Sequence, residues 1–243
     1  MKKVLVASIF SLIFLLYYPV EEKKVEKVLE KSGFNIVENN SIIVEGDNSC
    51  FKYIRPKKIK KEKNLMIVAH PDDETIWGGG HLIKDDYYVV CITCGNVSYR
   101  NLEFQTVMEK TNDEYIFLYY PDLTNGHIDS WEYYYDDIKE SLNQIINSRN
   151  WNSIVTHNPE GEYGHIHHQM TSSIVTDLTS KEKLYYFGKY YYDYEIPEME
   201  TLDNDTYSKK MNELISVYVS QPIAMNRHHH MMIYEKFIPY NEW

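Results

Sequence analysis

Two groups of side chains in this sequence have the types and spacing that metal-assisted hydrolysis needs. The first, in the stretch VAHPDDETIWGGG, places four such residues in five positions: His70, Asp72, Asp73 and Glu74. The second, in THNPEGEYGHIHHQM, contains His165 and His168, which share a face if a helix begins there. Imidazole and carboxylate ligands with an open position suit catalytic zinc or another divalent metal, and a carboxylate free of the metal can accept a proton from water. We therefore expect a divalent metal site with hydrolytic chemistry.

The elements that position these groups can be read from the apolar runs before them. LMIV precedes His70 and WNSIV precedes the second group, so each group follows a short predicted strand. From Asn64 onward, strands predicted at Leu65–Ala69, Tyr88–Thr93, Tyr115–Leu118 and Ser153–Thr156 alternate with helices predicted at Thr75–Lys84, Leu102–Lys110, Asp129–Arg149 and His167–Leu178. This alternation predicts a single α/β domain, with a mostly parallel sheet and helices on both faces. Successive parallel strands end at the same edge, so both groups should meet there.

The C-terminal part of the chain is expected to add smaller elements to this domain. Beyond Lys183 the pattern predicts strands in KLYYFGKYYYDYE, a helix over Lys209–Tyr218 and a further strand in HHHMMIYEKFI. Three consecutive glycines, Gly78–Gly80, are expected to allow close packing of a helix on the sheet, because no phosphate-binding lysine follows them.

Composition and charge restrict the partners. The 243 residues are 43% hydrophobic and 25% charged, which is typical of one well-packed domain with small additions. A formal net charge of −11 argues against nucleic acid as a partner, because neutralising phosphates needs a basic face.

The N-terminus has the pattern of a targeting segment. Residues 1–20 combine two lysines with an apolar run from Val4 to Tyr18, and no small-residue cleavage site follows. We expect either an export signal or an uncleaved membrane anchor, and hence a protein of the secretory pathway or one held at a membrane through residues 4–18. Residues 21–63, with a short strand in SIIVEG, are expected to form a membrane-proximal or peripheral segment, and residues 64–243 the catalytic domain.

AHPDDE followed by GHIHH, an H-x-x-H motif, resembles the PIG-L/LmbE family of zinc-dependent N-acetylglucosaminyl de-N-acetylases over roughly residues 64–180. The resemblance implies a Rossmann-like α/β fold and removal of an acetyl group from an N-acetylated amino sugar. It assigns the zinc ligands to His70, Asp73 and His168, and the general base to Asp72. Aspartates at these positions could instead cap a helix.

The resemblance also assigns residues to the substrate. His165 is expected to support the charge that develops on the carbonyl oxygen, and Tyr163 to help polarise that carbonyl. Arg100 and Asp122 match positions that face the sugar in relatives. Two plainer interpretations stay open, in which Arg100 pairs with Glu103 on one helix and Asp122 is a turn residue.

Two remaining residues beside the motifs receive non-catalytic interpretations. Glu74 is expected to support the site without binding metal, as the family pattern suggests. His167 matches no ligand position and is interpreted as a surface histidine.

The sequence thus predicts a metal-dependent amidase that hydrolyses the acetamide of an N-acetylglucosamine-containing glycan or glycoconjugate. One alternative is a metal-binding glycan-recognition protein without turnover, and another is a metal hydrolase that acts on a different bond. The motifs leave the acceptor open among a glycolipid, a polysaccharide and a small glycoside.

Overall fold

The computed structural model of this chain describes residues 42–46, 49–53 and 64–243. The predicted signal or anchor at residues 1–20 lies outside this part of the chain. Within the segment 21–63 the structure describes two antiparallel strands, β1 (Ile42–Gly46) and β2 (Ser49–Tyr53), so the strand predicted in SIIVEG is present. Among the described residues, no helix has the length and apolar character needed to cross a bilayer.

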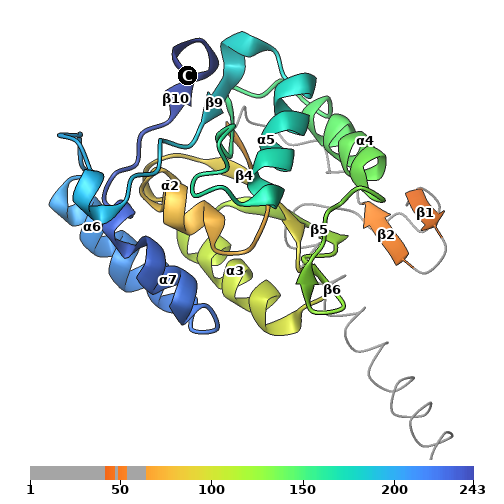
Figure 1. Ribbon diagram of the computed structural model, residues 1–243, viewed down its shortest axis with the longest axis horizontal. Coiled ribbons are helices and arrows are strands. Elements are labelled where there is room, and N and C mark those ends of the chain that lie inside the picture. The colour runs from red at the N-terminus through yellow and green to blue at the C-terminus, as the bar shows by residue number, and fades with distance from the viewer. Residues whose placement is uncertain (1–41, 47–48, 54–63) are drawn as a thin grey trace, which may run out of the picture.

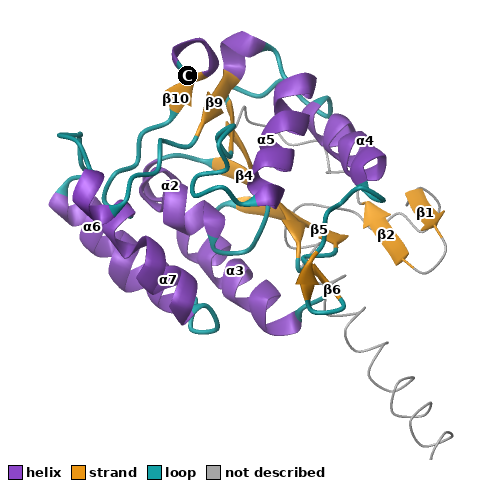
Figure 2. Ribbon diagram, viewed as in Figure 1, coloured by secondary structure: helices purple, strands orange, loops and turns teal. Residues whose placement is uncertain are grey.

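A six-stranded sheet forms the centre of the domain (Figures 1 and 2), in the order β10-β9-β8-β3-β4-β5. Its strands are β3 (Asn64–Val68), β4 (Tyr87–Thr93), β5 (Glu114–Tyr120), β8 (Ile154–Thr156), β9 (Leu184–Tyr186) and β10 (Ile238–Pro239). The first five run parallel to their neighbours, and β10 pairs antiparallel with β9 at one edge. The predicted α/β domain with a mostly parallel sheet is confirmed.

Helices cover both faces of this sheet, as alternate residues of the central strand show. Leu65 and Ile67 pack in a core with α4 (Tyr135–Ile146) and α5 (Ile166–Leu178). Met66 and Val68 point the other way, into a core with α2 (Asp73–Lys84) and α3 (Ser98–Thr111). Because both faces are buried, the strand is apolar throughout rather than alternating.

The chain reverses its direction of travel across the sheet next to β3. From β3 it proceeds through α2, β4 and α3 to β5, and then crosses back so that β8 lies on the other side of β3. The carboxyl ends of β3 and β8 therefore border the crevice where open α/β sheets bind ligands. Both chemistry-bearing motifs follow these two strands.

Two predicted helices in the rest of the chain begin at other residues. The helix predicted from Asp129 begins only at Tyr135, because a turn at Trp131 (φ 54°) comes first; it follows a hairpin of β6 (Leu123–Thr124) and β7 (His127–Ile128). The helix predicted over Lys209–Tyr218 begins earlier, and runs through α6 (Asn204–Lys209), a π-helical turn η3 (Lys210–Leu214) and a 3₁₀ turn η4 (Ile215–Val217).

The strand predicted in HHHMMIYEKFI is wrong for most of its length: His228–Met231 are helical, and Ile238 alone of these residues belongs to a strand. Pro222 begins α7 (Pro222–His228), a 3₁₀ turn η5 (His229–Met231) follows, and only Ile238–Pro239 is extended. In KLYYFGKYYYDYE only β9 is a strand, and a 3₁₀ turn η2 (Asp193–Glu195) follows it; two more such turns are η1 (Lys181–Lys183) and η6 (Tyr240–Glu242). Burial of methionines and His228 against α2, rather than sheet pairing, decides the conformation of this segment.

A buried ion pair fastens the C-terminal helical segment to α2. The ammonium of Lys210 contacts the carboxylate of Glu235 and donates to the carbonyl oxygens of Ile76 and Met232, each at 2.8 Å. Glu235 also accepts the backbone N–H of Gly80 at 2.8 Å.

The glycines of α2 permit this approach. A Cβ at Gly79 would lie 3.2 Å from the Lys210 side chain, at Gly78 2.7 Å from Met66, and at Gly80 2.7 Å from Leu202. The expected close packing of the helix on the sheet holds at Gly78, whereas Gly79 and Gly80 allow close approach of the C-terminal part of the chain.

We predict that Lys210→Met lowers the free energy of unfolding by roughly 3–5 kcal/mol, because it leaves Glu235 charged, buried and without its cation. Urea denaturation of the full chain measures this loss. The matched control is Lys209→Met at the exposed neighbouring position, which should change the free energy of unfolding by less than about 0.5 kcal/mol. Equal stabilities of the two variants would contradict the role of the ion pair.

Candidate functional site

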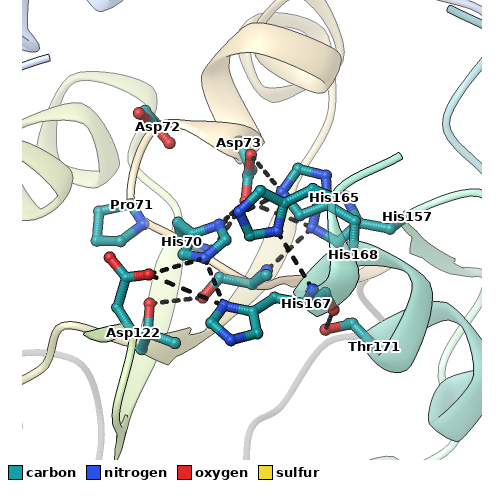
Figure 3. Close-up of polar contacts among 12 residues, drawn as sticks. His70, Pro71, Asp72, Asp73, Asp122, His157, His165, His167, His168 and Thr171 are labelled. Atoms are coloured by element: carbon teal, nitrogen blue, oxygen red, sulfur yellow. Dashed lines mark hydrogen bonds and ion pairs between the residues drawn. The ribbon is translucent and has the colours of Figure 1, made fainter. Parts of the chain in front are cut away.

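Three side chains from the two motifs converge at the carboxyl ends of β3 and β8 (Figure 3). The Nδ1 atom of His70 lies 3.2 Å from Oδ2 of Asp73 and 3.3 Å from Nε2 of His168. Nε2 of His168 lies 3.3 Å from Oδ1 of Asp73. All three side chains are buried. The structure thus brings together the three residues that the sequence predicted as metal ligands.

The spacing and protonation of this trio fit a divalent metal. In a tetrahedral site with ligands at 2.0–2.1 Å, neighbouring ligand atoms lie about 3.3–3.4 Å apart, close to the separations found here. Nδ1 of His168 lies 2.6 Å from Oε2 of Glu162, a carboxylate that can only accept, so this nitrogen carries the proton. Nε2 of a neutral His168 therefore presents its lone pair to the other two residues. A carboxylate behind a ligating imidazole is the usual support of a metal site.

Among the residues that the structure describes, three groups of three have ligand atoms within 4.8 Å of one another and involve side chains outside this trio, and the first two are Asp73, His157 and His168, and His70, Asp122 and His167. In the first, Nε2 of His157 already accepts the backbone N–H of Ala69 at 3.0 Å. In the second, the two imidazole nitrogens lie 2.9 Å apart, which is a hydrogen-bond distance and shorter than a tetrahedral ligand separation. Hydrogen bonding accounts for both groups better than a metal does.

His165, His70 and His168 form another such group. His165 precedes α5 as its N-cap, and its Nδ1 accepts the backbone N–H of His167 at 3.2 Å. Only Nε2 of a neutral His165 can then donate a hydrogen bond. Burial and the neighbouring imidazoles of His70 and His168 lower the pKa of His165 to about 3.

Asp72 lies beside the trio rather than within it (Figure 3). Asp72 occupies the N-cap position of α2 with a backbone φ of 121°, but its side chain makes no capping hydrogen bond to the helix. Burial, followed by the charge of Asp73, raises the pKa of Asp72 to about 8, against the opposing charge of Arg100. A raised pKa means that this buried carboxylate can hold a proton once it has accepted one, which suits a role in proton transfer.

The carboxylate of Glu74 holds the unusual backbone of Asp72 in place. Glu74 is fully buried and accepts the backbone N–H of Asp72 at 3.0 Å, the hydroxyl of Thr75 at 2.6 Å and the hydroxyl of Tyr218. Strained backbone of this kind persists only where its surroundings fix it. This geometry agrees with the expectation that Glu74 supports the site.

The two predicted substrate residues, Arg100 and Asp122, are linked to Asp72 through the guanidinium of Arg100. The guanidinium nitrogen Nη2 of Arg100 donates to the carbonyl of Pro71 at 2.5 Å and lies 3.4 Å from Oδ2 of Asp72. The nitrogen Nη1 lies 3.5 Å from Oδ2 of Asp122. Glu103 instead binds the backbone N–H of Ser220 at 2.8 Å, so the helix salt bridge between Arg100 and Glu103 is not formed.

Tyr163 packs against the histidines rather than hydrogen-bonding to them. Its ring lies 5.5 Å from that of His168 and 5.9 Å from that of His165, and it stacks on His228 at 4.5 Å. Burial raises its pKa above the usual range, so it is a neutral phenol.

Sequence reasoning missed two buried supports. His157 stacks on His168 at 3.8 Å and donates from Nδ1 to Glu162 at 2.9 Å, so one carboxylate serves both imidazoles. Glu162 sits at a left-handed φ of 54°, in a turn where Gly161 (φ 72°) leaves no room for a Cβ beside the His165 carbonyl. The position of His157 could have indicated its place in the site, because it comes directly after β8, just as His70 comes two residues after β3.

The interpretation of His167 as a surface histidine is wrong. Its side chain is fully buried, its ring stacks on Trp131 at 4.0 Å, and its Nδ1 lies 2.9 Å from Nε2 of His70. No pattern in the sequence indicates this burial, because Asp129 and Trp131, which cover His167, come from the segment between β5 and α4.

Comparison with known proteins matches the part of the chain that contains these residues. Residues 65–179 match the model of the PIG-L family, described as GlcNAc-PI de-N-acetylase. The chain is 33% identical over 150 residues to an uncharacterised protein of Acanthamoeba polyphaga mimivirus, covering 55% of this chain and 63% of the relative. It is 26% identical over 153 residues to the N-acetylglucosaminyl-phosphatidylinositol de-N-acetylase of Saccharomyces cerevisiae, covering 56% of this chain and 50% of the relative. The chain thus matches less than two thirds of either relative's length.

We predict that the full chain binds one equivalent of Zn²⁺, and that Asp73→Ala or His168→Ala weakens binding by more than about 100-fold, since changes to outer residues alone cost 10–100-fold. Competition with a chromophoric chelator measures the affinity. Asp72→Asn is the matched control and should bind zinc within a few-fold of the wild type. Unchanged binding by the two ligand variants would contradict the assignment.

Replacement of Glu74 should expose its structural role. Glu74→Ala leaves three buried donors without an acceptor, so we expect the free energy of unfolding to fall by at least about 2 kcal/mol, measured by urea denaturation with chelator present. Glu74→Gln retains an acceptor oxygen and should lose clearly less. If both variants were as stable as the wild type, the turn at Asp72 would not depend on this carboxylate.

Proposed function

We propose, from the premise that residues 65–179 form a PIG-L family domain, that this protein hydrolyses the acetamide of an N-acetylglucosamine-containing glycan or glycoconjugate. The products are acetate and a free amino sugar. The observation that carries the proposal is the convergence of His70, Asp73 and His168 within 3.2–3.3 Å of one another, with the separate carboxylate of Asp72 beside them.

Zinc is the proposed metal, held by His70, Asp73 and His168. Two neutral imidazoles and one carboxylate are a common ligand set of catalytic zinc, with a further position left for water or substrate. When bound, the ion would act as a Lewis acid and lower the pKa of a water molecule.

Asp72 is the proposed general base. Its carboxylate is held away from the ligand trio by the backbone turn at φ 121°, and it can accept the proton of the attacking water. The same residue can return that proton to the leaving amine, which must depart as a neutral or protonated amine. Arg100, 3.4 Å away, favours the ionised form of Asp72 before the reaction.

His165 and Tyr163 are the proposed donors to the carbonyl oxygen as negative charge develops on it. Because Nδ1 of His165 accepts a backbone N–H, its Nε2–H is the donor available to substrate. A neutral donor aimed at a developing oxyanion is effective where water is excluded. Tyr163 supplies a second, phenolic donor on the same side, next to His165.

Arg100 and Asp122 are the proposed contacts to the sugar. Asp122 has a side chain 24% exposed, which leaves an oxygen able to bind hydroxyl groups, whereas the guanidinium of Arg100 is 11% exposed and mainly holds the two aspartates. The acceptor beyond the sugar is not specified by these residues. Export or anchoring through residues 1–20 stays a prediction from the sequence.

We predict that the full chain releases acetate from one or more of N-acetylglucosamine, its short oligomers and a glucosaminyl-inositol compound carrying an N-acetyl group. Removal of metal by a chelator should abolish release, and added zinc should restore it. Asp72→Asn should lower kcat by about 10²–10⁴-fold while zinc stays bound, because general-base catalysis contributes that much.

The outcomes separate the rival functions. Zinc binding without release from any N-acetylated compound would favour the glycan-recognition protein. Release by Asp72→Asn at the wild-type rate would remove Asp72 from the mechanism.

A further inference from the structure

The buried His167 connects a backbone carbonyl to a proposed metal ligand. Its Nε2 lies 2.7 Å from the backbone oxygen of Asp129, and its Nδ1 lies 2.9 Å from Nε2 of His70 (Figure 3 labels both histidines). The backbone of His167 is fixed as well, since its carbonyl accepts the hydroxyl of Thr171 at 2.7 Å. None of the roles proposed above uses this residue.

The hydrogen-bonding partners determine where each proton sits. A carbonyl oxygen only accepts, so Nε2 of His167 must carry a proton and donate it to Asp129. In a neutral His167, Nδ1 then has a lone pair. The single proton between the two rings therefore belongs to Nε2 of His70. Nδ1 of His70 faces Asp73 at 3.2 Å and His168 at 3.3 Å. With Nε2 protonated, Nδ1 is the nitrogen of His70 that can offer a lone pair to a metal, which would replace any proton that Nδ1 shares with Asp73.

We propose that His167 is a positioning residue that fixes the tautomer of His70, so that Nδ1 of His70 is the nitrogen offered to the metal. The proposal rests on the metal centre of the proposed function. It extends that function by assigning the second support of the ligand trio: Glu162 orients His168, and the pair of His167 and the Asp129 carbonyl orients His70.

The β6–β7 hairpin holds the acceptor carbonyl in place. The ring of Trp131 stacks on His167 at 4.0 Å with an interplanar angle of 6°. Trp131 has an unfavourable φ of 54°, and two hydrogen bonds hold it there: its indole N–H donates to the Pro121 carbonyl at 2.7 Å, and its backbone N–H donates to Oδ1 of Asp129 at 2.7 Å. The stacked ring and the carbonyl of Asp129 therefore fix both the plane and the rotation of His167.

This arrangement also leaves the carboxylate of Asp122 available for its proposed contact with sugar hydroxyl groups. Oδ1 of Asp122 lies 3.4 Å from Nε2 of His70, farther than Nδ1 of His167 at 2.9 Å. Because His167 accepts the proton of His70, the partly exposed carboxylate of Asp122 does not have to serve as its orienting partner.

Two substitutions separate orientation from packing. His167→Phe keeps an aromatic ring against Trp131 but removes both hydrogen-bonding nitrogens. His167→Asn keeps an oxygen that can accept from His70 and an NH₂ that can donate to Asp129. Thermal unfolding of both variants with chelator present reports whether either one loses its fold.

The first measurement is the tautomer itself, from long-range ¹H–¹⁵N spectra of the zinc-loaded full chain labelled at histidine, in which the nitrogen of His70 that binds the ion carries no proton. In the wild type we expect His70 and His167 both to carry the proton on Nε2. In His167→Phe we expect His70 to populate the other tautomer. A wild-type His70 protonated on Nδ1 would overturn the proposal.

The second measurement is zinc affinity, by competition with a chromophoric chelator. We expect His167→Phe to bind zinc about 10–100-fold more weakly and His167→Asn to bind within a few-fold of the wild type. Wild-type affinity in His167→Phe, or two zinc equivalents in the wild type, would overturn the proposal, the latter because His167 would then be a ligand. Neither readout depends on acetate release. A protein that binds zinc as predicted but deacetylates nothing would refute the proposed function alone.

Discussion

The carboxylate of Asp73 is the point at which the two halves of the site meet. It accepts the backbone N–H of His70 at 2.8 Å, and it lies 3.3 Å from Nε2 of His168 and 3.4 Å from Nε2 of His157. His70 follows β3, whereas both other histidines follow β8. These strands are neighbours only because the chain reverses across the sheet beside β3. One carboxylate thus contacts residues from both loops, by a hydrogen bond from the backbone of His70 and by close approach to two imidazoles of the loop after β8.

Two further buried carboxylates do structural work around this centre. Glu74 satisfies the backbone of Asp72 and two hydroxyl groups, and Glu162 accepts from both His157 and His168. Each is fully paired, which is what permits a carboxylate to be buried without excessive cost. Glu74 and Glu162 thus hold neighbouring groups in place, while Asp72 and Asp73 are the carboxylates proposed for proton transfer and ligation.

Several residues that hold the site in place come from segments whose sequence contains no recognisable catalytic or metal-binding motif. Asp129 contributes a backbone oxygen, Trp131 a ring face, and Tyr218 a hydroxyl from the C-terminal helical segment. Lys210 and Glu235 keep that segment against α2, close to the turn that presents Asp72. Stability of the peripheral elements and geometry of the site are therefore linked through packing on α2.

The sequence by itself determined the sheet and its alternation with helices, because buried parallel strands are continuously apolar. It also placed His70, Asp73 and His168 in short motifs next to those strands, and the resemblance to a family named them as candidate ligands. It also indicated the supporting role of Glu74. Only the tertiary structure decided that His167 is buried, that Arg100 pairs with aspartates rather than with Glu103, and that the segment after Pro222 is helical. These outcomes depend on contacts between residues distant along the chain, and no local periodicity encodes such contacts.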